Sequence, residues 1–395
     1  MSTSPELKIR DSATGQVIDV QAVRSSKHTK DFIRLPWHIY ADDPAWIPPL
    51  LLERRLHFSS LNPFFKHGSW QGWVAYINGK PVGRISAQID ELHRERYGQN
   101  TGHFGLVETI EDRRVLEALC VAAEAWLRER GATEISGPLG FSLNQECGVL
   151  VDGFEHPPVL MMPHSRPWYG KLLEEQGYLP AKDLLAYWVN VDFEPTEVLL
   201  RVLKRWDGRI KLRTLDRSRF SEEMELLRDL FNDAWSENWG FVPFTKAEFS
   251  ELGTSLRLLV PDEFIQIAEF NGEAVAFIAA LPNINELVTD LNGSLFPFGW
   301  LKLIWRIKKQ RAVTGRVPLM GVRKKYQKKA IGSALTFLIV DAVRHKLFER
   351  GIKEVEMSWI LENNTGMRAF LENVIECSVY KRYRLYHKTL TDKVT

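Results

Sequence analysis

The chain has 395 residues, of which 45% are hydrophobic and 26% charged, and its formal net charge is +2. This composition is typical of a folded globular protein with room for two domains, and the small net charge argues against a nucleic-acid partner. The three cysteines are scattered and form no CxxC pair, so the sequence predicts neither a zinc site nor a disulfide framework.

Hydropathy bears on the location of the protein. The first twelve residues are polar, and no run of 18 apolar residues occurs. We therefore expect neither a signal peptide nor a transmembrane helix. Because the cysteines are unpaired, a cytoplasmic location fits best.

Two segments predict β-hairpins of the same design. Residues 75–87 and 268–280 alternate apolar positions around an Asn-Gly pair, at Asn78-Gly79 in the first and at Asn271-Gly272 in the second. Asn and Gly tolerate the positive φ angles that a tight hairpin turn demands.

A second pair of matching elements follows the hairpins. Residues 116–130 and 333–350 predict helices, and each helix is followed by a glycine that ends it and by a short strand. The repeated order indicates a duplication, with a first copy over residues 1–195 and a second over 196–395.

The second copy carries an insertion. The hairpins are offset by 193 residues and the helix ends by 220, so the second copy has 27 more residues in between, at about 282–312. This segment contains a dense apolar run with Phe298 and Trp300. Eleven Lys or Arg residues and no acidic residue then lie between Lys302 and Lys329.

The insertion has two interpretations. It is either a core helix with a charged end, or an interfacial segment that lies on an anionic membrane or admits a lipid. It is too short to span a bilayer.

A phosphate-binding arrangement follows the insertion. An apolar strand over 317–322 leads into a basic loop with small residues, and a helix runs from there to about residue 350. Free N–H groups and the helix dipole favour an anion at the start of such a helix. Small residues let the backbone approach the phosphates closely.

This order of elements resembles the GCN5-related N-acetyltransferase (GNAT) superfamily. Its pyrophosphate-binding motif, Gln/Arg-x-x-Gly-x-Gly/Ala, corresponds here to residues 327–332, with Ala330 in place of the first Gly. The resemblance implies an α/β (α+β) fold of two tandem GNAT-like domains, each a mixed, mostly antiparallel sheet flanked by helices. It implies acyl-CoA as co-substrate, with no metal and no permanently bound cofactor.

The resemblance also implies the residues that would hold coenzyme A. They are Met320, Gly321, Val322, Gln327, Lys328, Lys329, Ala330, Ile331, Gly332, Ser333 and Asn364. Asn364 has a second interpretation as an ordinary helix cap. The first copy has acidic residues over 105–114, where phosphates would lie, so we expect it to be degenerate.

Four residues are candidates for acid–base roles. The tyrosine that protonates the thiolate in many family members is replaced by Leu371, and Tyr380 is a possible substitute, with sheet packing as the alternative. Glu237 could hydrogen-bond an amine, and Glu146 and His164 are possible general bases. Each of these three could instead be a buried hydrogen-bonded residue or a surface charge.

Further residues are candidates for binding the acceptor. In this superfamily the segment between the first two helices, here 233–244, walls the acceptor site, which implicates Asn238 and Trp239. Phe298 and Trp300 of the insertion would contact a lipid-like substrate.

The segments FFKHGSW, NQECG, ENWGFVPF and LFPFGWLKL resemble a bacterial group that includes the bacterial ceramide synthases. This implies transfer of an acyl group from acyl-CoA to a primary amine, expected to be a long-chain sphingoid base, with peripheral contact at the inner face of the cytoplasmic membrane. The alternatives are an acetyl-CoA-dependent N-acetyltransferase of a small molecule or protein, a transferase of aminoacyl groups from tRNA, and a non-catalytic acyl-CoA-binding sensor.

Overall fold

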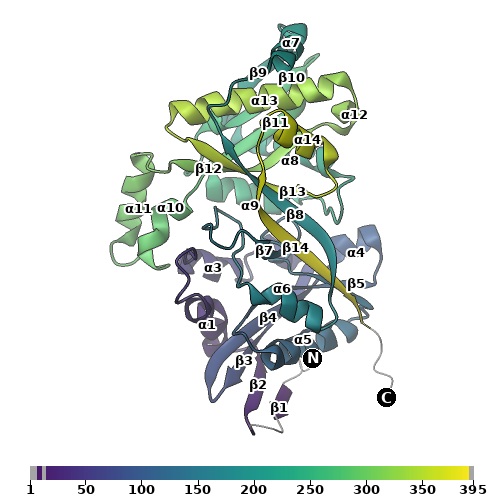
Figure 1. The fold of residues 1–395 in the computed structure, drawn as a ribbon, viewed down its shortest axis with the longest axis vertical. Coiled ribbons are helices and arrows are strands. Elements are labelled where there is room, and N and C mark those ends of the chain that lie inside the picture. Colours follow the sequence, from purple (N-terminus) through teal and green to yellow (C-terminus); the bar gives the residue numbers. More distant parts are fainter. Residues whose placement is uncertain (1–6, 11–14, 391–395) are drawn as a thin grey trace. The chain divides into compact units, whose positions relative to one another are not determined.

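A computed structural model describes residues 7–10 and 15–390 and divides the chain into two compact units (Figure 1). The first unit comprises the described residues up to Leu184, the five residues Leu291–Leu295, and residues 381–390. The second comprises Leu185–Asp290 and Phe296–Tyr380. The sequence-based division at 195/196 differs from this, because the last strand enters the first unit.

The first unit is built on a mixed sheet with strand order β1-β2-β3-β4-β5-β6-β14, and β7 also pairs with β14. Only β5 and β6 run parallel among the registered pairs of this unit's described residues. The elements are β1 (Leu7–Arg10), β2 (Val17–Ala22), α1 (Ser26–Arg34), α2 (Pro36–Ile39), α3 (Leu51–His57), η1 (Pro63–Lys66), β3 (Gly68–Ile77), β4 (Lys80–Asp90), α4 (Glu91–Tyr97), β5 (Thr101–Thr109), α5 (Arg113–Arg128), β6 (Glu134–Gly137), β7 (Val149–Asp152) and α6 (Trp168–Glu175). Two strands have residues in both units, β8 (Leu179–Asn190) and β14 (Val379–Thr389).

Side chains of β3 point alternately to the two faces of this sheet, and helices cover both faces. Trp73 and Ala75 belong to the main core with α5, whereas Val74 and Tyr76 pack with Phe32 of α1. This is the period-two burial expected for a sheet that is covered on both sides.

The second unit repeats this plan with strand order β8-β13-β12-β11-β10-β9. Its elements are α7 (Glu197–Trp206), β9 (Ile210–Thr214), η2 (Arg217–Arg219), α8 (Phe220–Trp235), α9 (Lys246–Leu256), η3 (Asp262–Phe264), β10 (Ile265–Phe270), β11 (Glu273–Pro282), α10 (Asn285–Val288), η4 (Thr289–Leu291), α11 (Gly299–Lys308), β12 (Thr314–Val322), α12 (Lys324–Gln327), α13 (Ala330–Glu349), β13 (Glu354–Leu361) and α14 (Thr365–Asn373). Phe277 packs in the core with α8, and its neighbour Ile278 lies on the α13 face. The predicted mixed, mostly antiparallel sheets are confirmed.

Both Asn-Gly turns have the backbone that the sequence predicts. Asn78 and Asn271 have φ of 50° and 52°, and the glycines that follow them also have positive φ. The helices α5 and α13 end before Gly131 and Gly351, which adopt φ of 78° and 81°. These matched turns and stops put the two copies in the same structural order.

The insertion folds as the short helices α10 and α11. None of the α11 residues is buried, which rules out a core helix. Arg306 ties α11 to α10 by donating to the Leu287 carbonyl oxygen at 2.6 Å and to Asp290 at 2.7 Å. Among the described residues, no helix combines the length and apolar character needed to cross a membrane.

Candidate active site

The loop between β12 and α13 has the features of a phosphate cradle. Helix α13 starts at Ala330 without a side-chain cap from the described residues. The Gly332 N–H donates to the Lys329 carbonyl oxygen at 2.8 Å, which leaves the N–H groups of Ala330 and Ile331 for a ligand. A Cβ at Gly332 would lie 2.4 Å from the Tyr326 carbonyl oxygen and 2.9 Å from that of Gln327. Only glycine therefore fits this position without displacing the loop.

Side chains of the loop and of α8 hold the cradle in shape. The Gln327 amide donates to the carbonyl oxygens of Val322 and Ala234, each at 2.8 Å. The Lys324 N–H donates to Asp233 at 2.9 Å. Gln327 thus acts as a brace for the loop, whereas the motif resemblance assigned it to the ligand.

The cations of the loop divide into paired and unpaired groups. Arg323 pairs with Asp229 at 2.7 Å, Lys324 with Glu237 at 2.7 Å, and Lys325 with Glu273 at 2.5 Å. Within the described part of the chain, Lys328 and Lys329 form no ion pair, although Lys328 lies near enough to Glu237 to help lower its pKa, and Lys329 Nζ lies 5.7 Å from the centre of the Tyr326 ring. Together with the helix start, these two residues fit a pyrophosphate group.

Replacing Lys328 and Lys329 with alanine should weaken coenzyme A binding by about tenfold, because two unpaired charges at the cradle are lost. The salt dependence of the dissociation constant should also decrease. Isothermal titration calorimetry at two ionic strengths measures both. Lys325→Ala is the matched control, since its ammonium is already paired, and an equal loss in this control would contradict the assignment.

Strands β12 and β13 separate next to the cradle. They pair in parallel from Thr314↔Glu354 to Val317↔Met357, and both continue beyond this ladder, to Val322 and Leu361. Pro318 follows the last paired residue of β12 and has no N–H to donate. Beyond this proline β12 has no registered pair with β13. The carbonyl oxygens of Met320 and Val322 accept from Trp235 and Gln327, each at 2.8 Å, so it is the N–H groups on the β13 side of this segment that remain for a thioester arm.

A fully buried carboxylate lies at the base of this separation. Glu356 on β13 is 0% exposed; its Oε2 accepts a hydrogen bond from the Tyr380 hydroxyl, and its Oε1 has no partner among the described residues. The register places Glu356 beside Arg316 of β12, whose guanidinium donates to the Ser358 hydroxyl at 2.9 Å. A buried carboxylate with one free oxygen can accept a proton in this site.

Sequence reasoning missed Glu356 and identified only its partner, Tyr380. The segment EVEMSWIL gives only a weak signal, because Glu354, Glu356 and Ser358 alternate with apolar residues as in an ordinary half-exposed strand, whereas the structure buries Glu356 completely. Such a residue is costly to bury unless it has a partner or a function.

Other predicted residues of the second copy have structural roles. Asn364 caps α14 by accepting from the Met367 N–H at 3.2 Å, as its alternative interpretation stated. Leu371 is buried at 1% exposure. Glu237 is exposed, and the hydrogen bond from Lys324 lowers its pKa, which makes it a poor proton acceptor.

The loop after α8 places Trp239 at the surface, with 36% of its area exposed. Asn238 is half-buried one turn after Trp235. Trp235 donates to the Met320 carbonyl oxygen at 2.8 Å and packs edge-on against Trp359 of β13. This loop therefore lies close to the end of β12.

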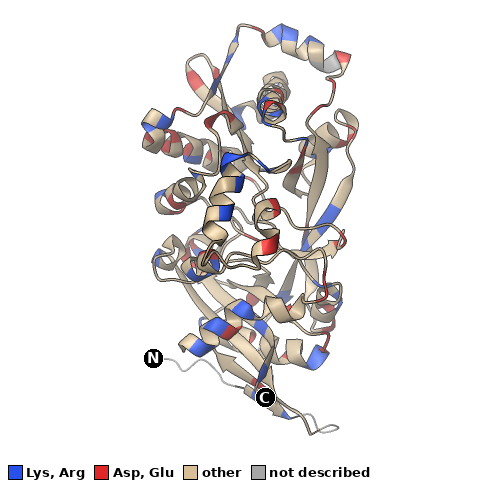
Figure 2. Ribbon diagram, turned by 90° about the vertical axis from the view of Figure 1, so that its left-hand side faces the viewer, with Lys and Arg blue, Asp and Glu red and all other residues tan. Residues whose placement is uncertain are grey.

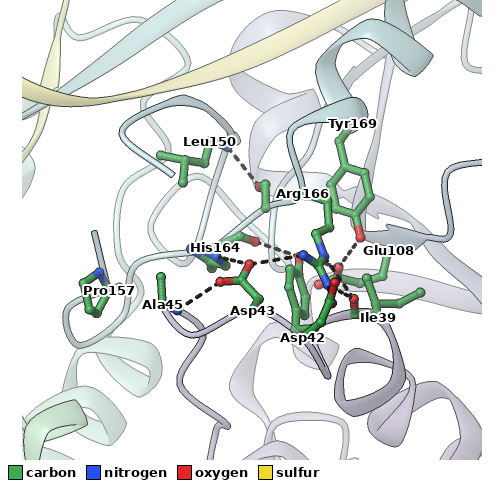
Figure 3. A network of polar contacts seen from close by, with 12 residues as sticks. Ile39, Asp42, Asp43, Ala45, Glu108, Leu150, Pro157, His164, Arg166 and Tyr169 are labelled. Atoms are coloured by element: carbon green, nitrogen blue, oxygen red, sulfur yellow. Dashed lines mark hydrogen bonds and ion pairs between the residues drawn. The ribbon is translucent and has the colours of Figure 1, made fainter. Parts of the chain in front are cut away.

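The first unit carries the two remaining acid–base candidates, and both have polar partners; Figure 3 draws the surroundings of His164. His164 Nε2 lies 3.0 Å from Asp43, its side chain is 2% exposed, and burial lowers its pKa. Glu146 forms an ion pair with Arg54 at 3.0 Å. Figure 3 also shows Arg166 hydrogen-bonded beside His164 in this buried polar network.

In the first unit a side chain caps the start of helix α5, whereas the start of α13 in the second unit has no side-chain cap among the described residues. Helix α5 is capped by Asp112, whose side chain accepts from the Arg114 N–H at 2.9 Å. The hydrogen bond from the Arg114 side chain lowers the pKa of Asp112. A side-chain carboxylate thus lies at the start of α5, the helix that corresponds to α13 of the second copy. Among the described residues, no cluster of three or more His, Cys, Asp or Glu side chains could hold a metal.

Comparisons with known proteins agree with this geometry. Residues 224–374 match the Acetyltransferase (GNAT) family. The chain is 50% identical over 372 residues to Protein YghO of Escherichia coli (94% of this chain, 95% of that protein). It is 42% identical over 381 residues to the bacterial ceramide synthase of Caulobacter vibrioides (96% and 99%). A solved tandem GNAT protein from the clavulanic acid biosynthesis pathway has a similar fold, with a TM-score of 0.54 at 13% identity over 95% of this chain and 99% of that one.

Proposed function

Because this chain belongs to the GNAT acyltransferase family, in the bacterial group that includes the Caulobacter ceramide synthase, we propose that it transfers a long acyl chain from acyl-CoA to the amine of a sphingoid base. The observation that carries the proposal is the 42% identity to that enzyme over 96% of the chain. The open cradle at Gly332 supports use of a coenzyme A thioester.

The proposed chemistry is direct aminolysis. An ammonium acceptor has a pKa of about 10 and must lose a proton before it attacks. We assign this proton to Glu356. The amine nitrogen then forms a bond to the thioester carbon and releases its second proton to solvent while the carbon–sulfur bond breaks. Tyr380 protonates the leaving thiolate and regains its proton from Glu356 through the hydrogen bond between them.

The β12 backbone beyond Val317 has a proposed role in the same step. Its N–H groups on the β13 side are the donors that we assign to the developing oxyanion. Glu146 is a weaker candidate for the base than Glu356 because Arg54 holds its carboxylate in an ion pair, and His164 is weaker because burial lowers its pKa.

The insertion supports a lipid acceptor. Helix α11 and the residues before it expose a set of apolar side chains between 42% and 74%, which are Phe296, Phe298, Trp300, Leu301, Ile304 and Trp305. Basic residues follow at once, and Figure 2 views the chain from the side where α11 lies. We assign this surface to peripheral contact with an anionic membrane, at the inner face of the cytoplasmic membrane.

Changing Trp300 and Trp305 to serine should weaken binding to anionic vesicles by about tenfold or more, because two inserted aromatics are lost. Vesicle sedimentation measures this binding. Phe348→Ser removes an equally exposed ring from α13 and should have no effect. Unchanged binding of the tryptophan variant would count against a membrane role for α11.

The function is tested by turnover of the purified chain. Palmitoyl-CoA and acetyl-CoA are each incubated with and without a sphingoid base, free thiol release is recorded, and the amide product is identified by mass spectrometry. We expect thiol release that requires both palmitoyl-CoA and the long-chain amine. Turnover with acetyl-CoA and short amines alone would indicate an acetyltransferase. Binding of acyl-CoA with no thiol release for any amine would indicate a sensor.

A further inference from the structure

A second cavity lies in the second unit, far from the phosphate cradle. Its volume is about 250 Å³, and its lining includes Arg350 and Ile352, which follow the end of α13. The cradle lies at the opposite end of this helix, which has 20 residues. At 1.5 Å per residue the two ends are about 30 Å apart, so this cavity is separate from the nucleotide site.

The floor of the cavity is apolar. The side chains that form it come from the loop after α9, from the α10 region and from the segments before β12 and β13, and all are less than 9% exposed: Val260, Phe264, Ile284, Leu287, Ala312 and Ile352. A ligand that is only an inorganic ion would gain nothing from this surface. The floor therefore indicates a ligand with a hydrocarbon part.

The rim of the cavity is cationic. Five basic side chains surround the floor, namely Arg217, Arg257, Lys308, Arg311 and Arg350. Asp262 and Glu263 pair with Arg217 and Arg350 respectively. Among the described residues, the other three basic side chains have no carboxylate partner, which leaves an excess of three positive charges at the rim.

Two of the unpaired cations are positioned by aromatic rings. The Arg257 guanidinium lies 4.9 Å from the centre of the Phe220 ring, and that of Arg311 lies 4.4 Å from the Trp305 ring. Cation–π contacts hold these groups at the rim without neutralising them. The charge of the rim therefore favours an anionic head group over the amine acceptor.

The cavity adjoins the exposed apolar surface of α11. Ile307 and Lys308 at the end of this helix line the cavity, and Trp300, Ile304 and Trp305 of the same helix are exposed. We propose that the cavity binds the head group and the first chain carbons of one anionic membrane phospholipid. This inference rests on the proposed membrane contact. Surface charge alone would attract the protein to any anionic membrane, whereas this cavity would select one lipid within it.

The site is tested first with a soluble lipid. Dihexanoyl phosphatidylglycerol is titrated as monomers into the full-length chain by calorimetry, with dihexanoyl phosphatidylcholine and inorganic phosphate as comparison ligands. We expect one lipid per chain, bound at least about tenfold more tightly than either comparison ligand. Equal binding of the phosphatidylcholine would overturn the head-group assignment. Equal binding of phosphate would show a simple anion site.

Variants then locate the site. Arg257→Glu combined with Arg311→Glu should weaken phosphatidylglycerol binding about tenfold or more. Ile307→Trp should do the same by filling the cavity, while the weak response to phosphate persists. Lys204→Glu combined with Arg205→Glu makes the same change of net charge on α7, in the same unit, and should leave binding unaltered. If this control lost as much phosphatidylglycerol binding, the loss would follow from the change in net charge alone, and the proposed site would be refuted.

Turnover separates this inference from the proposed function. The Arg257→Glu, Arg311→Glu variant should keep its rate with palmitoyl-CoA and a detergent-solubilised sphingoid base within about twofold, because both residues lie at the far end of α13. Lipid selectivity without turnover in the unmodified chain would reject the function and keep the cavity assignment. Turnover without lipid selectivity would reject the cavity assignment alone.

Discussion

Replacing Gly332 with alanine is expected to weaken coenzyme A binding by about a hundredfold and to reduce turnover with it. The added Cβ would lie 2.4 Å from the Tyr326 carbonyl oxygen, so the loop would have to move away from the start of α13. The N–H groups that we assign to the pyrophosphate would then lose their common orientation. Isothermal titration calorimetry with free coenzyme A measures the effect directly.

Two controls bracket this result. Ala330→Gly adds the glycine that the family motif usually has, at an exposed position, and should keep or improve the affinity. Thermal unfolding of the Gly332→Ala protein should show an intact transition, which separates a damaged cradle from a damaged fold. Full affinity in the Gly332→Ala protein would mean that coenzyme A does not bind at this helix start.

Replacing Glu356 with glutamine should lower kcat by roughly a hundredfold to ten-thousandfold, the usual contribution of a general base. The amide has the same shape and can still accept the Tyr380 hydrogen bond, so the affinity for acyl-CoA should change little. Stopped turnover with retained binding would therefore identify loss of chemistry rather than loss of structure.

The pH dependence makes the test of Glu356 stricter. Without a base, only the free amine reacts, and its fraction rises about tenfold per pH unit below a pKa of about 10. The rate of the Glu356→Gln protein should follow this slope, and the unmodified enzyme should show a flatter profile. Glu354→Gln on the same strand is the matched control and should behave as the unmodified enzyme does. If the Glu356→Gln and Glu354→Gln proteins showed the same change of pH profile, Glu356 would not be the base in this reaction.

Features decided by local backbone chemistry were predictable from the sequence. The two Asn-Gly turns, the glycines after α5 and α13 and the loop at Gly332 each depend on a few neighbouring residues, and the structure has them where the sequence placed them. The acidic residues that the sequence shows over 105–114 include Asp112, which the structure places as the N-cap of α5.

Features decided by packing between distant segments were not predictable. Glu356 reads locally as an ordinary strand residue, and only the fold shows that one of its oxygens is buried and free. The segment 233–244 was expected to wall the acceptor site, but two of its aromatic residues, Phe241 and Phe244, are buried in the core beside α8. Asn232 fixes this outcome by bonding both the N–H and the carbonyl oxygen of Phe244.

The last strand has a consequence for how the protein is made. Strand β14 pairs with β6 from Tyr386↔Gly137 to Thr389↔Glu134, and its residues from Lys381 on belong to the first unit. During translation these residues are synthesised after the whole of the second unit. The first unit therefore cannot complete its sheet until the second unit has been synthesised, although domains usually fold in N-terminal-first order.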